Sequence, residues 1–326
     1  MTDLHVRKMR FGFAESDVPF LWNPSDPAFS CATNALSFFF LAIEKMIGAA
    51  VAEALPLITD SEVVEEAQAF VRQEGQHSMA HRQHAKGLIK SHPALQATLD
   101  AVIGVFDELT ATRSLKYRLA YIADLEATFT PSFKMMLDNA DSLFAPGDDR
   151  VASLFLWHFV EEIEHRSSAL IIYDAVVGDP WYRMRAAPSV FKHAGSAIVA
   201  ATRGFNEHIP RETQRVDATS IFGGQGWKRA LSQRFPSLTR FPSFDLTDHG
   251  PFQKPYPHVR LREQVAAAYG VARSQIPGHM PAHQKLPVFA AEWLARYDAG
   301  YDCSRWYTAA RTRDIEKLSG IEPRLD

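Results

Sequence analysis

Two glutamates of this sequence stand alone among apolar residues at helical spacing. Residues three or four apart share one face of a helix. The face that carries Glu44 also carries Leu36, Phe40, Ile47, Val51 and Leu55. The face that carries Glu126 also carries Leu115, Leu119, Ile122, Phe129 and Phe133. A lone buried carboxylate costs several kcal/mol unless it is paired or binds a metal ion, and by itself such an acid more often indicates a misjudged register or a buried ion pair, so Glu44 and Glu126 become predicted metal ligands only together with further ligands.

Two other segments each place a glutamate and a histidine three residues apart. Glu74 and His77 form the first Glu-x-x-His pair, and Glu162 and His165 form the second. Residues three apart lie about 60° apart around a helix, so one pair can bind one metal ion. Single glutamates from two helices, combined with Glu-x-x-His from two others, are typical of di-iron carboxylate bundles. The order along this chain therefore predicts a dinuclear metal site.

Several neighbouring polar residues could belong to the same site. His158 lies one turn before Glu162 on the same face, where a metal ligand and a residue that hydrogen-bonds to a ligand are equally good interpretations. His81 and His84 extend the face of His77, and for them the hydrogen-bonding role is favoured. Glu161 and Glu164 do not lie on the helix face that carries Glu162 and His165. Glu164 is expected at solvent or beside an arginine, and Glu161 beside the ligands.

The two single glutamates and the two Glu-x-x-His pairs each fall on a separate predicted long helix. Periodicity, caps and stop signals place these helices at about residues 33–55, 61–90, 115–139 and 149–177. Shorter helices are expected near residues 94–110 and 181–205. No strand pattern of useful length appears. The predicted fold class is all-α, a ferritin-like four-helix bundle with extra helices and a long irregular C-terminal cap.

The chain divides into three predicted parts. Pro19, Pro24 and Pro27 argue against a long helix near the start, so residues 1–30 are expected to form an irregular arm. Residues 31–205 carry the bundle and the metal site. Residues 206–326 change to loop-rich composition with short helices, and are expected to cover the bundle.

Composition excludes several classes of protein. The 326 residues are 46% apolar and 22% charged, with a formal net charge of -3, so no field favours nucleic acid. The first residues lack the apolar core of a signal peptide. Glu44, Lys45 and Glu53 interrupt the most apolar stretch, so no membrane span is expected. A cytoplasmic protein follows. Motifs of serine hydrolases (GxSxG) and zincin proteases (HExxH) are absent from the sequence.

Three segments resemble a bacterial family described as predicted metal-dependent hydrolases of ferritin-like type. They read ALSFFFLAIE at residues 35–44, FVRQEGQHSMAHR at residues 70–82 and WHFVEEIEHR at residues 157–166. The resemblance covers roughly residues 5–205. The family usually carries an aromatic-Pro-Phe-His-Pro segment after the bundle, to which residues 241–258 are only loosely similar, so the substrate side is expected to differ.

The ligand pattern alone is also similar to that of the di-iron arylamine N-oxygenases, which have a third histidine on the last Glu-x-x-His helix. By that resemblance seven residues would all be ligands: Glu44, Glu74, His77, Glu126, His158, Glu162 and His165.

From this pattern we expect a non-haem di-iron carboxylate oxidase or oxygenase that holds two Fe ions, with Mn or Zn as alternatives. Its expected partners are a small-molecule substrate, dioxygen and an external electron donor such as a ferredoxin-type reductase, with a homodimer left open. A hydrolase with a dinuclear metal centre is the first alternative function. A non-catalytic metal-binding or iron-storage protein is the second.

Overall fold

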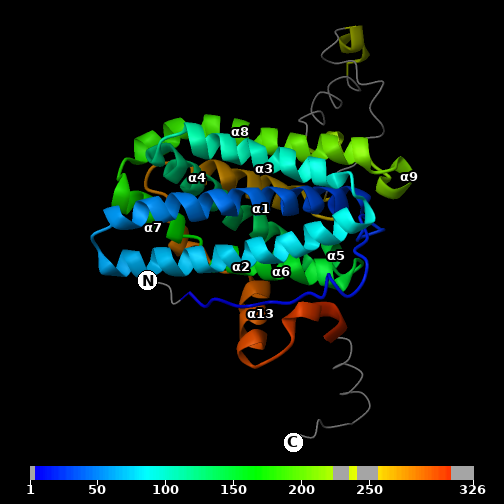
Figure 1. The fold of residues 1–326 in the computed structure, drawn as a ribbon, viewed down its shortest axis with the longest axis horizontal. Helices are drawn as coiled ribbons and strands as arrows, with labels where there is room; N and C mark the ends of the chain where they lie inside the picture. Colours follow the sequence, from blue (N-terminus) through cyan, green and yellow to red (C-terminus); the bar gives the residue numbers. More distant parts are fainter. Residues whose placement is uncertain (1–3, 223–234, 241–255, 310–326) are drawn as a thin grey trace, which may run out of the picture.

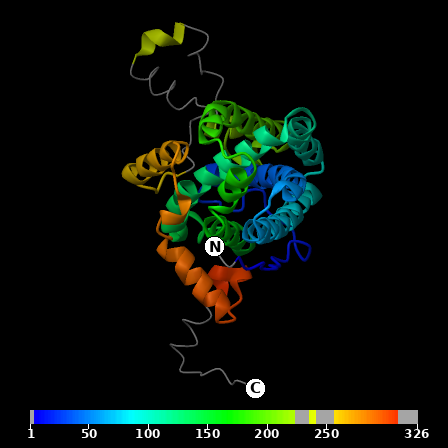
Figure 2. The same cartoon turned by 90° about the vertical axis from the view of Figure 1, so that its left-hand side faces the viewer.

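The computed structural model describes residues 4–222, 235–240 and 256–309, and helices dominate them. The long helices run along one direction and pack side by side (Figure 1), and the end-on view shows them surrounding a common interior (Figure 2). No strand occurs within the described ranges. The predicted all-α fold class is therefore confirmed, whereas the ferritin-like assignment and the three-part division stay predictions.

The helices of the first two thirds of the chain carry or surround the predicted site. They are α1 (Pro27–Ala54), η1 (Leu55–Leu57), α2 (Ser61–Ser91), α3 (Leu95–Thr112), α4 (Leu115–Asp138), α5 (Ala140–Leu143), α6 (Asp149–Glu164), α7 (Ser168–Val176) and α8 (Pro180–His208). Shorter elements follow: α9 (Arg211–Gln214), α10 (Ala218–Phe222), η2 (Pro236–Arg240), α12 (Leu261–Ser274), η4 (Pro281–His283), α13 (Val288–Asp298) and η5 (Cys303–Arg305). Other parts of the expected cap, residues 223–234, 241–255 and 310–326, lie outside the described residues.

The first helix begins earlier than the sequence predicts. Helix α1 starts at Pro27, inside the segment expected to be an irregular arm. Proline is tolerated there because the first helical N–H has no partner within the helix anyway. The Asp26 side chain accepts a hydrogen bond from the backbone N–H of Phe29 and caps the helix.

The predicted fourth helix is interrupted at its site histidine. Helix α6 ends at Glu164, His165 is its C-cap residue, and α7 begins at Ser168. The interruption leaves carbonyls without a helical partner. The Arg166 guanidinium donates to the Ile163 carbonyl at 2.7 Å. A side chain therefore replaces one of the backbone hydrogen bonds that the interruption removes. The prediction of one continuous helix was wrong here.

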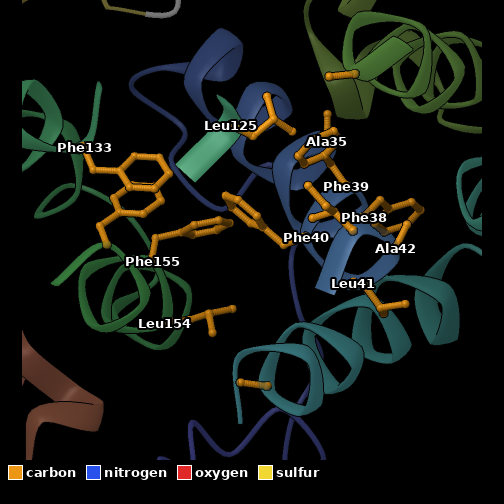
Figure 3. Packing of buried hydrophobic residues seen from close by; sticks show 14 of the residues in the cluster. Ala35, Phe38, Phe39, Phe40, Leu41, Ala42, Leu125, Phe133, Leu154 and Phe155 are labelled. Carbon is orange, nitrogen blue, oxygen red and sulfur yellow. The ribbon is translucent and has the colours of Figure 1, made fainter. Parts of the chain in front are cut away.

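Large apolar side chains fill the space between the site helices. Figure 3 shows Phe40 of α1 pointing toward Phe155 of α6, with Phe133 of α4 beside them. Phe133 stacks on Phe159 with ring centroids 4.0 Å apart and planes 10° apart. Dense aromatic packing excludes water and lowers the local dielectric around any polar group enclosed with it.

Among the residues that the structure describes, one helix is long and apolar enough to cross a membrane by length and composition. It is α1 with the turn after it, Pro27–Leu57, in which an 18-residue stretch has a mean hydropathy of 1.8. Glu44, Lys45 and Glu53 were expected to rule out a membrane span here, but the helix still meets the length and composition of one. However, 72% of that stretch is buried inside the protein. The core helix of a soluble protein is buried in the same way. The cytoplasmic location stays a prediction.

Candidate metal centre

The structure brings all seven predicted site residues into one buried cluster. Glu44 comes from α1, Glu74 and His77 from α2, Glu126 from α4, and His158 and Glu162 from α6, with His165 as the cap of α6. The most exposed of the seven, Glu44, has a relative exposure of 5%. Each helix turns its otherwise apolar face inward, so the acids that interrupt those faces converge on one another.

One group of ligand atoms gathers around the Nε2 atom of His165. This nitrogen lies 3.1 Å from Glu162 Oε2, 3.3 Å from Glu74 Oε1 and 3.5 Å from Glu126 Oε2. The four residues each offer one atom within 4.8 Å of the others. Three carboxylates and one imidazole at this separation could hold one metal ion.

A second group lies beside the first and shares a residue with it. Glu44, Glu74 and His77 also offer atoms within 4.8 Å of one another. The Nδ1 atom of His77 is 4.0 Å from Glu74 Oε2 and 3.6 Å from Glu162 Oε1. Glu74 belongs to both groups and would contribute to both positions, because its Oε1 lies beside His165 and its Oε2 lies toward His77.

Buried polar atoms without hydrogen bonds show that these residues fit a metal. Both oxygens of Glu44, both oxygens of Glu74, Oε2 of Glu126 and Nδ1 of His77 have no hydrogen-bond partner. Such groups are rare in folded interiors, because each one costs its full desolvation free energy. Their convergence in one place is the arrangement that a divalent cation would satisfy.

The protonation of the cluster also reflects the crowding of its acids. Burial and the neighbouring carboxylates raise the pKa of Glu44 and Glu74 well above the ordinary value, and raise the pKa of Glu126 to about 8. Burial opposes ionisation of Glu162 as well, but His165 and His158 outweigh it and hold its pKa well below the ordinary value. Burial likewise opposes the charge on His165, and Glu162 outweighs it, so the pKa of His165 is raised well above its usual value. The crowding therefore disfavours negative charge at Glu44, Glu74 and Glu126 and favours it at Glu162 beside His165.

His158 begins a buried series of hydrogen bonds that we name the histidine row, made of His158, His81, Ser37 and His84. His158 Nε2 lies 2.6 Å from Glu162 Oε1, and its Nδ1 lies 2.6 Å from His81 Nε2. The hydroxyl of Ser37 lies 2.7 Å from His81 Nδ1 and 2.8 Å from His84 Nδ1. The row ends at His84 Nε2, which is buried and has no partner.

The histidine row is neutral and has one consistent direction. Burial lowers the pKa of His158 to about 4 and that of His84 to about 3, and lowers the pKa of His81 well below its usual value. A carboxylate can only accept, so His158 Nε2–H donates to Glu162. It follows that His81 donates to His158, Ser37 to His81, and His84 to Ser37.

Direct metal ligation by His158 stays an untested prediction. In this geometry both of its ring nitrogens already have hydrogen-bond partners, and the same is true of His81. His84 contacts no member of the ligand groups through its ring nitrogens, because Nδ1 meets Ser37 and Nε2 has no partner.

Sequence reasoning missed three residues that support the site. Ser37 belongs to the histidine row, Gln73 accepts a hydrogen bond from His165 Nδ1 at 3.1 Å, and Arg7 binds Glu161 and Glu164. Gln73 directly precedes Glu74, but no periodicity distinguishes it from a surface glutamine. The partners of Arg7 lie 154 and 157 residues away, so no local pattern could have shown them.

A buried cluster of glutamates and histidines on converging helices defines a metal-binding α-helical protein. Comparison with protein families then assigns the chain: residues 5–250 match the model of the family described as predicted metal-dependent hydrolase, and the chain belongs to that family. The family that the three sequence segments resemble is thereby confirmed. No curated protein matches the chain, and no solved structure matches it either.

The family assignment corrects the predicted activity. A di-iron oxidase or oxygenase was the first expectation, and it was wrong, because the family is described as hydrolases and agrees with the alternative. The physical reason is that carboxylate and imidazole ligands suit oxygen chemistry and hydrolysis alike, so a ligand pattern alone does not choose between them. Dioxygen and an external electron donor were expected only with the oxygenase, and no finding tests them.

Proposed function

We propose that this chain is a hydrolase with a dinuclear metal centre that acts on a small organic substrate. The residues that would hold the two ions are Glu44, Glu74, His77, Glu126, Glu162 and His165. The observation that carries the proposal is the group of buried carboxylate oxygens and the imidazole nitrogen of His77 that face one another without hydrogen bonds. The family match supports the reaction class.

The chain's own residues prepare this centre in specific ways. When bound, divalent metal ions supply polarisation of the scissile group and a hydroxide nucleophile near neutral pH. His158 donates to Oε1 of Glu162 and so fixes the orientation of that carboxylate. The other oxygen, Oε2, lies beside His165. The surrounding phenylalanines exclude bulk water, which strengthens every electrostatic interaction in the site.

The identity of the metal is a finer part of the proposal. Four carboxylates with two or three imidazoles suit Fe, Mn and Zn, of which Fe was the first expectation. Metal analysis of the protein purified from its native host, by plasma mass spectrometry, would identify the ion. Two equivalents per chain are expected, because the two ligand groups share Glu74 but have separate histidines.

Hydrolysis can be tested with two chromogenic substrates. Protein loaded with Zn(II), Mn(II) or Fe(II) should cleave p-nitrophenyl acetate or p-nitrophenyl phosphate, and a chelator should abolish the rate. Glu126→Ala should reduce turnover by more than roughly 100-fold, since even residues that only orient ligands are worth 10–100-fold. Glu65→Gln, an exposed acid on α2, is the matched control and should keep full activity. Metal retained at two per chain without turnover of either substrate would reject the hydrolase and favour the non-catalytic alternative.

A further inference from the structure

The N-terminal arm delivers one arginine to the outer side of the metal-binding helices. In Figure 1 the arm runs along α2 and α6, and α13 lies on its other side. Arg7 of the arm is 3% exposed. Its Nη1 donates to Glu161 Oε1 at 3.0 Å, and its Nη1 and Nη2 donate to Glu164 at 2.8 and 3.0 Å. We name Arg7, Glu161, Glu164 and Gln73 the Arg7 clamp.

The first branch of the Arg7 clamp reaches His77. The second oxygen of Glu161 accepts a hydrogen bond from His77 Nε2 at 2.9 Å. That contact places a proton on Nε2 and leaves Nδ1 as the free lone pair. Nδ1 is the nitrogen that faces the carboxylate cluster and has no partner. Glu161 therefore fixes both the ring orientation and the tautomer of this predicted ligand.

The second branch reaches the other histidine of the Glu-x-x-His pairs. The amide nitrogen of Gln73 donates to Glu164 Oε2 and to the carbonyl of His5, each at 2.9 Å. With its nitrogen committed outward, the amide oxygen of Gln73 faces inward and accepts from His165 Nδ1 at 3.1 Å. His165 Nε2 is thereby left to point at the carboxylates. Both histidine ligands are thus oriented through acids that Arg7 binds.

Helix α13 supports the arginine from the opposite side. The guanidinium carbon of Arg7 lies 5.3 Å from the ring centre of Tyr297 and 5.9 Å from that of Trp293, and these two rings stack with planes 10° apart. Arginine presents a planar fork that binds carboxylates with two parallel hydrogen bonds while its face rests on aromatic rings. A lysine at the same place would keep the charge but lose this geometry.

We propose that Arg7 is a positioning residue of the metal centre, and that the N-terminal arm and α13 complete the site from outside the metal-binding helices. The inference rests on the proposed metal centre and extends it to residues that touch no metal. Groups that hold histidine ligands through their second nitrogen are typically worth 10–100-fold in metal affinity. Because one arginine serves both histidines, its loss should weaken both ions.

The test compares two arginines that hold the same arm to the same helix. Arg7→Lys keeps a charge beside Glu161 and Glu164 but removes the fork. Arg150→Lys is the matched control, because Arg150 binds the arm carbonyls of Ser16 and Asp17 and hydrogen-bonds to no predicted ligand. Zn(II) affinity is measured by competition with a chromogenic chelator, and Co(II) absorption reports the ligand geometry. Melting of the metal-free protein separates affinity from stability.

Arg7→Lys should lower Zn(II) affinity by roughly 10–100-fold and alter the Co(II) spectrum, whereas Arg150→Lys should change the affinity by less than about threefold. Equal affinity in Arg7→Lys and wild type, or equal losses in the two variants, would overturn the inference. Should Arg7→Lys fail to fold, Tyr297→Leu carries the same test, since it removes an aromatic face from Arg7 and leaves the carboxylates intact. Wild-type protein that binds two ions and hydrolyses nothing would reject the proposed function but not the role of Arg7.

Discussion

The Arg7 clamp and the histidine row support the same carboxylate cluster by opposite physical means. The clamp is ionic: the buried pair of Arg7 and Glu161, the partly exposed Glu164 and the amide of Gln73 orient His77 and His165. The row is neutral: three imidazoles and a hydroxyl lead from Glu162 to a nitrogen without a partner.

This difference determines how costly a substitution in each support should be. In the clamp every donor and acceptor has one fixed role, because guanidinium only donates and carboxylate only accepts. The row also has one direction, which the acceptor Glu162 sets, but its members are neutral, so a broken hydrogen bond there leaves no buried charge without a partner. We therefore expect the clamp to be the costlier of the two to disrupt, and the row to be the more tolerant.

Removal of metal should have the largest effect, because both supports converge on the same ligands. A ligand present at 1,000 times its dissociation constant stabilises the native state by about 4 kcal/mol per site. Excess chelator should therefore lower the melting temperature of loaded protein substantially, as measured by calorimetry. Identical melting curves with and without chelator would show that the cluster binds no metal.

Glu161→Ala should have the next largest effect, because it breaks the clamp at its centre. Arg7 loses one buried partner and His77 Nε2–H loses its acceptor. Breaking a buried ion pair from one side costs about 3 kcal/mol or more of unfolding free energy. Urea unfolding of the metal-free protein measures it, with Glu65→Gln as control. A loss of unfolding free energy below about 1 kcal/mol would mean that the clamp is no costlier to disrupt than the row.

His84→Phe should change the pH dependence of stability of the metal-free protein. Burial lowers the pKa of His84 from its ordinary value of 6.5 to about 3 in the folded state. The folded protein therefore resists protonation, and its stability falls as the pH falls from 6.5 toward 3. Phenylalanine removes this loss, so the variant should gain on wild type by about 2 kcal/mol at pH 5, measured by urea unfolding between pH 7 and 5. A pH-independent difference would contradict a buried neutral His84.

Ser37→Ala should have the smallest effect of the four. It removes the hydroxyl between His81 and His84 and leaves two imidazole nitrogens without a partner. The expected cost is about 1–2 kcal/mol, with a Zn(II) affinity that changes less than in Arg7→Lys, because His81 still meets His158. Ser37→Thr keeps the hydroxyl and is the matched variant. An affinity loss larger than that of Arg7→Lys would reverse the comparison.

The ligand helices could be predicted from the sequence because their signal is local. Glu44 and Glu126 interrupt apolar faces at helical spacing, and the two Glu-x-x-His pairs lie within one turn each. The structure gathers all of them. The break after Glu164 could not be predicted, since what makes it tolerable is the Arg166 side chain folding back to the Ile163 carbonyl.

The supporting residues and the reaction were beyond the sequence for different reasons. Arg7, Gln73 and Ser37 act on partners that are distant in sequence, and nothing in their own neighbourhood marks them. The reaction could not be chosen because the same ligands serve oxygen activation and hydrolysis. There the family match favours hydrolysis, against the first expectation.

The contacts of Arg7 also bear on how the protein is made. Synthesis proceeds from the N-terminus at roughly 5–20 residues per second, and segments fold as their partners emerge. Arg7 leaves the ribosome well before its partners, because its carboxylate partners follow 154 and 157 residues later and the aromatic rings of Trp293 and Tyr297 come later still. The nascent bundle can therefore assemble well before its histidines are fixed, and metal acquisition is expected as a late step of folding.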